Sequence, residues 1–323
     1  MPLFSRTRLF AALTLGAALC APALAQDFPN KPITFIVPFA AGSATDQIGR
    51  AIGQGVTEQT GQPVVIENRP GASAMIGAQT AARAAPDGYT VLITTNTTHA
   101  ANEHLYKSLA YDPVKDFAPI TLLGKGGQIM VVHPDAPAKT VGEFIEQARK
   151  QPGRLSFGSG SSSSRIAGEL LQQMAGIELL HVPYKSNPLG ITDLLGGQID
   201  TMITDTATGL PQVSAGKLRA LGVTGSERSA LAPEIPTIAE AGVPGYEMGY
   251  WFAAYAPAGT PEPVVARLHE LLRKAADSKA AESFYRQTGT AKETSTPQEL
   301  AAFQAEESKK WGRIIKSAGI QPE

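Results

Sequence analysis

The sequence has almost no cysteine and no excess of charge of either sign. One of its 323 residues is cysteine, Cys20, so no disulfide can form within the chain. Because Cys20 lies in a segment that we expect to be removed, no thiol nucleophile or thiolate metal ligand is expected either, and a hydrophobic core must hold the fold. Lysine and arginine number 28 against 29 acidic residues. Nucleic-acid binding needs a strongly basic surface, so we expect no nucleic-acid partner.

Long apolar runs are also absent after the first 25 residues. Two arginines precede an apolar run from Leu9 to Leu19, which at about eleven residues is too short for a bilayer, since a spanning helix needs roughly 20. Ala23-Leu24-Ala25 then fits the small-x-small cleavage pattern. We predict an exported protein with a signal peptide over residues 1–25, cleaved after Ala25. The alternatives are a buried N-terminal helix and a lipoprotein acylated at Cys20, which the bulky residue before that cysteine disfavours.

Strand and helix patterns alternate along the rest of the chain, which favours an α/β fold with largely parallel sheets. Ile33–Val37 and Val64–Ile66 read as strands on either side of a helical periodicity. The same order recurs over residues 155–182. Two such units predict two similar domains, although βαβ units are common enough for the likeness to be generic. No low-complexity linker is present, so we expect strands that cross between the domains.

The first unit has a turn of small residues, 38–46, between its strand and its helix. A helix N-terminus presents unsatisfied N–H groups and a partial positive charge, so such a turn can bind an anion. It is neither a phosphate loop nor a dinucleotide fingerprint, and ordinary helix capping by Ser43 or Thr45 is the alternative. Asp46 would either brace the turn or meet an ammonium group or water. The candidate ligand contacts here are Phe39, Ala40, Gly42, Ser43, Ala44 and Asp46.

The second unit has a richer turn, Gly158–Ser164, with five serines and two glycines at one strand-to-helix junction. Hydroxyl and N–H donors suit a carboxylate, and capping alone needs fewer of them. A flexible surface loop is the alternative. Arg165 follows at once, either as a second anchor for an anion or as a solvated surface residue. The candidate contacts are Ser159, Gly160, Ser161, Ser162, Ser163, Ser164 and Arg165.

Further polar candidates follow other predicted strands. Thr95 and Asn96 come at the end of one strand and Asp205 at the end of another, and ligands of open α/β sheets bind at such carboxyl ends. Trp251 belongs to an aromatic cluster for which we favour a packed core or a strand that crosses between the domains. The alternative is that Trp251 forms a wall of the ligand cleft.

Neither catalysis nor metal binding is expected. The spacing of His99 and His104 does not put them on one face of a helix, and no H-E-x-x-H occurs, so we predict no metal site and no cofactor. There is no G-x-S-x-G elbow, and no histidine is expected beside the serine turn as a base, which disfavours an exported serine hydrolase. A ligand sensor that reports to a signalling partner would use the same cleft as a transport protein.

Several segments in order resemble one family, the substrate-binding proteins of tripartite tricarboxylate transporters, also called Bug proteins. The resemblance extends over nearly the whole chain after residue 27. It is carried by residues 28–33, 36–46, 67–72, 85–90, 181–185, 193–200, 235–237, 242–246 and 256–261. Tyr184, within the fifth of these segments, is a further candidate ligand contact.

The resemblance implies a two-lobed periplasmic binding protein fold of type II, with the ligand in a cleft between two α/β domains. We assign domain 1 to residues 26–125 and 251–323 and domain 2 to residues 126–250. The resemblance implies a ligand that is delivered to a membrane permease. Family ligands are mostly small carboxylates, namely dicarboxylates, tricarboxylates, aromatic acids and acidic amino acids, and sometimes neutral relatives of these. We therefore expect a periplasmic monomer that is not an enzyme, with one ligand carboxylate held between the two turns.

This chain departs from the family pattern in both turns. Ser43 stands where a second glycine is usual. The second turn is shorter and richer in serine, with Arg165 near the usual place of a histidine. We interpret these departures as an altered ligand preference.

Overall fold

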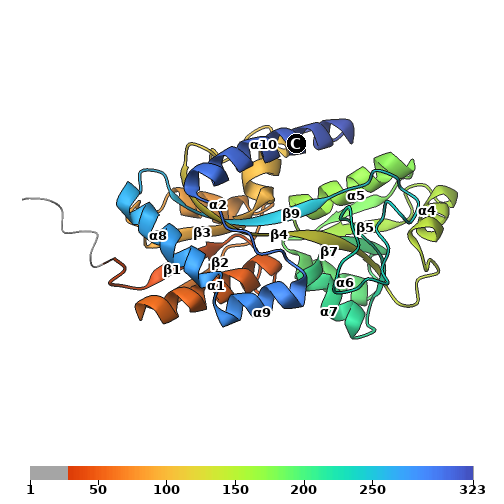
Figure 1. The fold of residues 1–323 in the computed structure, drawn as a ribbon. Coiled ribbons are helices and arrows are strands. Elements are labelled where there is room, and N and C mark those ends of the chain that lie inside the picture. The colour runs from red at the N-terminus through yellow and green to blue at the C-terminus, as the bar shows by residue number, and fades with distance from the viewer. Residues whose placement is uncertain (1–27, 323) are drawn as a thin grey trace, which may run out of the picture.

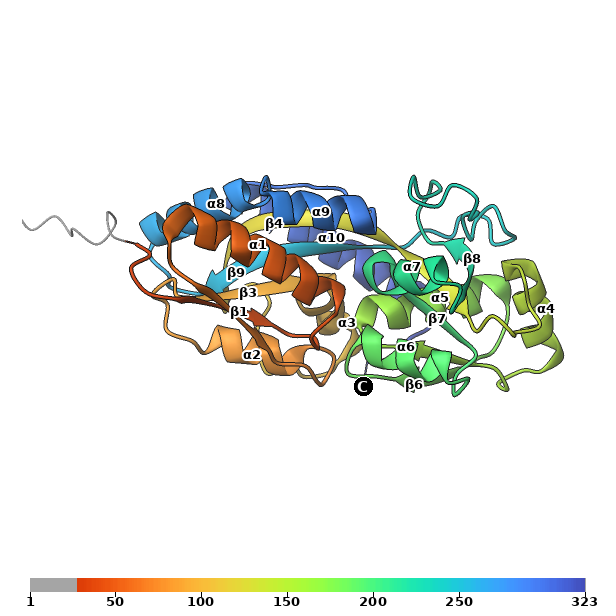
Figure 2. The same ribbon diagram turned by 90° about the horizontal axis from the view of Figure 1, so that it is seen from below.

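The computed structural model describes residues 28–322 (Figure 1), so the predicted signal peptide and its cleavage site lie outside the described residues. Within that range a nine-stranded sheet runs in the order β2-β1-β3-β9-β4-β7-β5-β6, with β8 paired to β4. Helices cover both faces, and the molecule is elongated, with one lobe at each end (Figures 1 and 2).

The first lobe is built on the parallel strands β1, β2 and β3, as the first βαβ pattern predicts. Helix α1 buries its apolar stripe, including Ile48, Ile52 and Val56, and ends at Gly61, whose φ of 70° suits glycine. The elements of this lobe are β1 (Ile33–Val37), α1 (Ala44–Thr60), β2 (Val64–Asn68), α2 (Met75–Ala82), β3 (Thr90–Thr95), the π-helix η1 (Thr97–Ala101), α3 (Asn102–Leu105), α8 (Glu262–Ala275), α9 (Lys279–Thr288) and α10 (Pro297–Ser317).

The second lobe repeats the βαβ arrangement, with β5 parallel to β6 and β7. Helix α5 follows β5 at the serine-rich turn and buries Ile166 and Leu170, at the helical spacing expected from the sequence. The elements are α4 (Val141–Lys150), β5 (Ser156–Ser159), α5 (Ser162–Ala175), β6 (Leu180–Pro183), α6 (Asn187–Leu195), β7 (Thr201–Asp205), α7 (Thr206–Ser214) and β8 (Arg219–Val223).

Two long antiparallel strands join the lobes. The first part of β4 (Phe117–Val132) pairs with β9 (Gly249–Pro257), and its second part pairs with β7 and β8. Both strands run through the middle of the molecule in Figure 1. The expectation of crossing strands in place of a flexible linker is confirmed. Among residues 28–322 the structure has no helix long and apolar enough to span a membrane.

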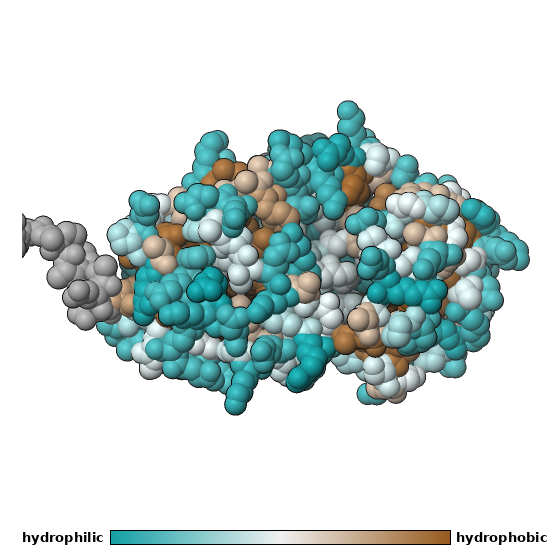
Figure 3. Space-filling model, in the orientation of Figure 1, coloured by the Kyte–Doolittle hydropathy of each residue, from teal (hydrophilic) through white to brown (hydrophobic). Residues whose placement is uncertain are grey.

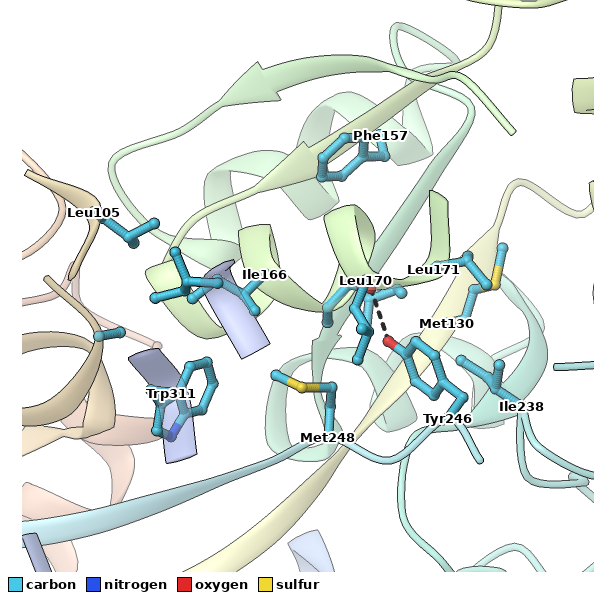
Figure 4. Packing of buried hydrophobic residues seen from close by; sticks show 14 of the residues in the cluster. Leu105, Met130, Phe157, Ile166, Leu170, Leu171, Ile238, Tyr246, Met248 and Trp311 are labelled. Carbon is cyan, nitrogen blue, oxygen red and sulfur yellow. Dashed lines mark hydrogen bonds between the residues drawn. The ribbon is translucent and has the colours of Figure 1, made fainter. Parts of the chain in front are cut away.

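An apolar cluster continues from one lobe into the other. In Figure 4, Leu105 of α3, Ile166 of α5 and Trp311 of α10 lie close together, and Met248 continues the cluster toward the second lobe. Most of the face shown in Figure 3 is hydrophilic, with scattered apolar residues. The residues of the cluster are buried, so the cluster lies inside the molecule where the lobes join.

Tyr246 carries one polar group into this core. Its hydroxyl donates to the Ala167 carbonyl at 2.8 Å, and the side chain is fully buried (Figure 4). We predict that Tyr246→Phe lowers the free energy of unfolding by about 1 kcal/mol, the usual net value of a buried hydrogen bond. Urea denaturation of the purified protein measures it. Tyr184→Phe, at a half-exposed position, serves as the control and should cost less.

Candidate functional site

The two glycine- and serine-containing turns meet at one cavity between the lobes. The cavity is small, with about 30 Å³ of room for the centres of water molecules, enough for roughly two or three waters. Both lobes and both crossing strands contribute to its wall. The lining residues are Phe39, Ser43, Ala44, Thr45, Thr95, Gln128, Gly160, Ser161, Ser163, Ser186, Asn187, Asp205, Tyr250 and Phe252.

The first turn presents the N-terminus of α1 to the cavity. Ser43 is the N-cap, and its hydroxyl accepts a hydrogen bond from the Asp46 N–H at 3.2 Å. The first helical N–H groups have no acceptor within their own helix, and Ala44 and Thr45, which carry two of them, line the cavity. This turn can therefore donate backbone hydrogen bonds to an anion.

Asp46 braces the first turn, which is one of the two roles that the sequence left open. One carboxylate oxygen accepts from the Gly42 N–H at 2.9 Å and from Arg50 Nε at 3.0 Å, and the other accepts from Asn68 Nδ2 at 3.0 Å. Asp46 is buried and does not line the cavity. Burial raises its pKa, but the bonds from Arg50, Gly42 and Asn68, with the charge of Arg50, lower the pKa below its usual value overall.

The second turn presents the N-terminus of α5 from the other lobe. Ser161 is its N-cap and accepts from the Ser164 N–H at 3.2 Å. Gly160 lies so close to the next loop that a Cβ there would be 2.1 Å from the Asn187 backbone nitrogen. The Gly160 N–H donates to Asn187 Oδ1 at 3.0 Å, so the turn and the start of α6 are held together. Glycine is required here by close approach of the backbone.

Two more helices begin at the same place. Ser186 and Asn187 begin α6, and Asp205 is the N-cap of α7, accepting from the Thr208 N–H at 2.8 Å and from Asn187 Nδ2 at 2.8 Å. Four helix N-termini, of α1, α5, α6 and α7, therefore converge on one cavity. The Ser-Asn-Pro pattern at 186–188 is a helix-start signal that could have drawn attention to α6.

Some polar groups around the cavity have no hydrogen-bond partner among the described residues. They include Gln128 Oε1 and Ser186 Oγ, which belong to buried lining residues, and Asn96 Nδ2, which is buried nearby. Buried polar atoms without partners are costly, so such atoms indicate a place for a bound solute or water. Gln128 lies in the second half of β4, at a position where the sequence pattern predicts no ligand contact.

Several candidates from the serine turn are engaged within the protein. Ser159 Oγ lies 2.7 Å from His181 Nε2, Ser162 Oγ donates to Asn102 Oδ1 at 2.7 Å, and Ser164 Oγ donates to the Ile203 carbonyl. These three serines do not line the cavity, whereas Ser161 and Ser163 do. The expectation that no histidine lies beside this turn is wrong, because β6 pairs with β5 and brings His181 next to Ser159.

The remaining candidates also point to other partners. Arg165 is close enough to Glu169 for its charge to offset partly the rise that burial causes in the Glu169 pKa. The Tyr184 hydroxyl donates to Asp193 at 2.8 Å, and Trp251 Nε1 donates to Glu307 at 3.1 Å. Ala40 and Gly42 shape the first turn, the former by accepting from the Ser43 N–H at 3.1 Å. For these residues a ligand contact remains a prediction.

The electrostatics of the cavity come from dipoles more than from side-chain charge. Asp205 is the only acidic residue among the lining residues, and no lysine or arginine is among them. His99 stacks on Tyr255 with ring centroids 3.9 Å apart, and burial lowers its pKa to about 3, so it is neutral at physiological pH. Within residues 28–322 no group of three His, Cys, Asp or Glu side chains is placed to hold a metal.

The crossed-strand fold and the interlobe cavity define a two-lobed solute-binding protein. The model of the tripartite tricarboxylate transporter family receptor matches residues 48–320, and the chain belongs to this family. It is a family of periplasmic solute-binding receptors that includes the Bug proteins. The expected family and fold class are thereby confirmed.

Solved structures of similar proteins share this fold. The structure of Rpa4515 from R. palustris with adipate is 35% identical, with a TM-score of 0.88, over 92% of this chain and all of that one. The periplasmic binding protein BugD is 32% identical, with a TM-score of 0.88, over 92% of this chain and all of that one. MatC from Rhodopseudomonas palustris with bound malate is 31% identical, with a TM-score of 0.84, over 89% of this chain and all of that one.

The brace at Asp46 gives a pH-dependent prediction. Because its folded pKa is lowered, its stabilising contribution is complete above the unfolded value of 3.8 and is lost as the pH falls through the folded value. We expect Asp46→Asn to cost on the order of 2 kcal/mol at pH 7, as hydrogen bonds to a buried charge do. In thermal melts from pH 7 to pH 3, the difference in stability between the wild type and Asp46→Asn should become smaller below about pH 4. A deficit that stays constant with pH would contradict the ionised brace.

The close approach of the backbone at Gly160 gives a further prediction. Gly160→Ala must push α6 away from the second turn, since a Cβ would overlap the backbone of Ser186 and Asn187. We expect at least a hundredfold loss of solute affinity by calorimetry. Gly142→Ala, where a Cβ would meet nothing nearer than 3.9 Å, is the matched control and should bind as the wild type does. Unchanged affinity in Gly160→Ala would show that α6 does not shape the site.

Proposed function

We propose that this protein captures a small organic carboxylate, most simply a dicarboxylate, between its lobes and delivers it to the permease of a tripartite tricarboxylate transporter. The single observation that carries the proposal is the convergence of four helix N-termini on one small interlobe cavity. The ligand carboxylate would accept from the backbone N–H groups of Ala44 and Thr45 on one side and from the second turn on the other.

The balance of charge at the cavity favours an anion. Each helix N-terminus acts as roughly half a positive charge, so four supply roughly +2. Asp205 supplies −1, and its carboxylate is already engaged with Thr208 and Asn187. A carboxylate that enters therefore meets a net positive field. Because the cavity is buried, solvent and salt screen that field only weakly.

Direct contact between the lobes implies that they move when a solute enters or leaves. Ser162 of the second lobe donates to Asn102 of the first lobe at 2.7 Å, and most residues that line the cavity are buried, so the described structure is a closed form. Opening about the crossing strands would admit the solute, and closure would replace its water with protein donors. We assign the moving parts as residues 26–125 with 251–323 and residues 126–250.

Relatives indicate the chemical class. Rpa4515 was solved with adipate and MatC with malate, both dicarboxylates, and these proteins are 35% and 31% identical to this chain. By extension we propose a periplasmic, monomeric protein, exported by the signal peptide over residues 1–25 and acting without a cofactor. Tricarboxylates, aromatic acids and acidic amino acids are the other ligands that the family resemblance suggests.

We propose that the protein does not catalyse a reaction. The specific observation in favour of a hydrolase is the hydrogen bond between Ser159 and His181, a pairing of nucleophile and base. Ser159 is, however, buried and outside the lining of the cavity, so a solute held between the lobes would not reach its hydroxyl. The pair stabilises the neighbouring strands β5 and β6.

Titration calorimetry tests the proposal with a panel of adipate, malate, succinate, citrate, benzoate and glutamate. We expect at least one member to bind with a dissociation constant of about 1 µM or tighter, about −8 kcal/mol. The neutral diamide of the best binder is the control and should bind at least a hundredfold more weakly, because helix N-termini favour the anion. Binding of neutral solutes alone would overturn the proposal.

A further inference from the structure

The turn serine Ser162 contacts the opposite lobe directly, with no solute between them. Its hydroxyl donates to Oδ1 of Asn102 at 2.7 Å, and both side chains are buried, at 2% and 0% exposure. Neither residue lines the cavity. Ser162 begins α5 in the second lobe, and Asn102 begins α3 in the first. This bond exists only while the lobes are close together.

Asn102 is oriented so that it can only accept from Ser162. Its amide nitrogen donates to the Ser73 carbonyl at 2.9 Å and lies 3.3 Å from the Tyr111 hydroxyl, which directs the amide oxygen toward α5. The Tyr111 hydroxyl in turn donates to the Thr98 carbonyl at 2.8 Å. The acceptor is thus preorganised within the first lobe, before the second lobe arrives.

The support beneath Asn102 is itself unusual. Ala72, Ser73 and Ala74 have φ values of 46°, 49° and 68°, three consecutive non-glycine residues in the left-handed region, which costs energy at each. The Ser73 hydroxyl also lies 2.6 Å from the Tyr106 hydroxyl. This strained turn holds the Ser73 carbonyl where Asn102 can reach it.

Apolar side chains from both lobes pack next to the hydrogen bond between Ser162 and Asn102. Ile166, one helical turn after Ser162, lies beside Leu105 of α3 and Trp311 of α10 (Figure 4). Helix α5 contacts both η1 and α10. Closure therefore buries this apolar contact together with the hydrogen bond, and both stabilise the closed form before any solute contributes.

We propose that Ser162 and Asn102 form an interlobe latch, which stabilises the closed form and sets how long a solute stays bound without touching it. The latch rests on the proposed function in that opening and closing accompany solute exchange. Ser162 is on this assignment a positioning residue, and the serines that face the solute are Ser161 and Ser163. Loss of the latch shifts the lobes toward the open form and speeds solute release.

The test compares Ser162→Ala with the matched change Ser164→Ala. Ser164 sits two residues away in the same helix turn, but its hydroxyl donates to Ile203 within the second lobe. Stopped-flow fluorescence with adipate, and with malate as a second probe, gives the rates. The two tryptophans of the chain are suitable reporters, since Trp251 and Trp311 both donate to Glu307 where the lobes join.

For Ser162→Ala we expect release of the probe to quicken about tenfold, the usual effect of one buried hydrogen bond, with little change in the association rate. Ser164→Ala should lower the melting temperature but leave the release rate within twofold of the wild type. In a double-mutant cycle, adding Ser162→Ala to Asn102→Ala should speed release no further, because the bond is already lost. Additive effects, or unchanged release in Ser162→Ala, would overturn the latch.

Small-angle X-ray scattering of the solute-free protein separates this proposal from the proposed function. Ser162→Ala should have a larger radius of gyration than the wild type and Ser164→Ala, whatever the protein binds. If the wild type binds neither adipate nor malate, the proposed dicarboxylate class fails, and the scattering alone decides on the latch. If the wild type binds and Ser162→Ala shows wild-type release and an unchanged radius, the latch fails and the proposed function stands.

Discussion

Unsatisfied N–H groups at helix N-termini are the constraint around which this structure is arranged. Each helix that follows a strand leaves backbone donors without acceptors in its first turn. In this protein α1, α5, α6 and α7 all begin at the junction of the lobes, at a cavity whose lining residues are mostly buried. In α1, α5 and α7 a side-chain cap, Ser43, Ser161 or Asp205 respectively, accepts a hydrogen bond from one backbone N–H of the first turn. The uncapped donors make the junction receptive to an acceptor from outside the chain.

The crossing strands make that convergence possible. Parallel βαβ units place their helix N-termini at the carboxyl ends of the strands. Because β4 and β9 join the sheets of the two lobes, the carboxyl ends of the parallel strands in one lobe face those in the other. Tyr250 of β9 lines the cavity and lies against β4 at Gly126, where a Cβ would be 2.4 Å from the tyrosine ring. The strands that connect the lobes thus also form part of the cavity wall.

The local parts of this arrangement could be predicted from the sequence, because their signals lie within a few residues. Apolar periodicity places α1 and α5, and the serines and glycines mark both turns. The contribution of Gln128 could not be predicted in this way, since it depends on which strands become neighbours in the sheet. Ser186 and Asn187 carry a local helix-start signal, but that signal does not show that α6 begins at the same cavity as α1 and α5. The same holds for His181, which approaches Ser159 only through the pairing of β5 with β6. Which two of the five serines line the cavity depends on side-chain directions that spacing alone does not specify.

The serine hydroxyls of the second turn differ in what they can stabilise: some face the solute, and others form bonds within the protein. Ser161 and Ser163 line the cavity, while Ser159, Ser162 and Ser164 bond to a neighbouring strand, to the opposite lobe and to a backbone carbonyl. A serine-rich turn can therefore hold its own shape, close the lobes and meet a solute with one residue type. Because interlobe bonds add to the stability of the closed form for every solute alike, they alter residence time without altering selectivity. Selectivity must then come from the lining residues, where Gln128 and Ser186 carry unpaired polar atoms and a solute can supply the missing partner.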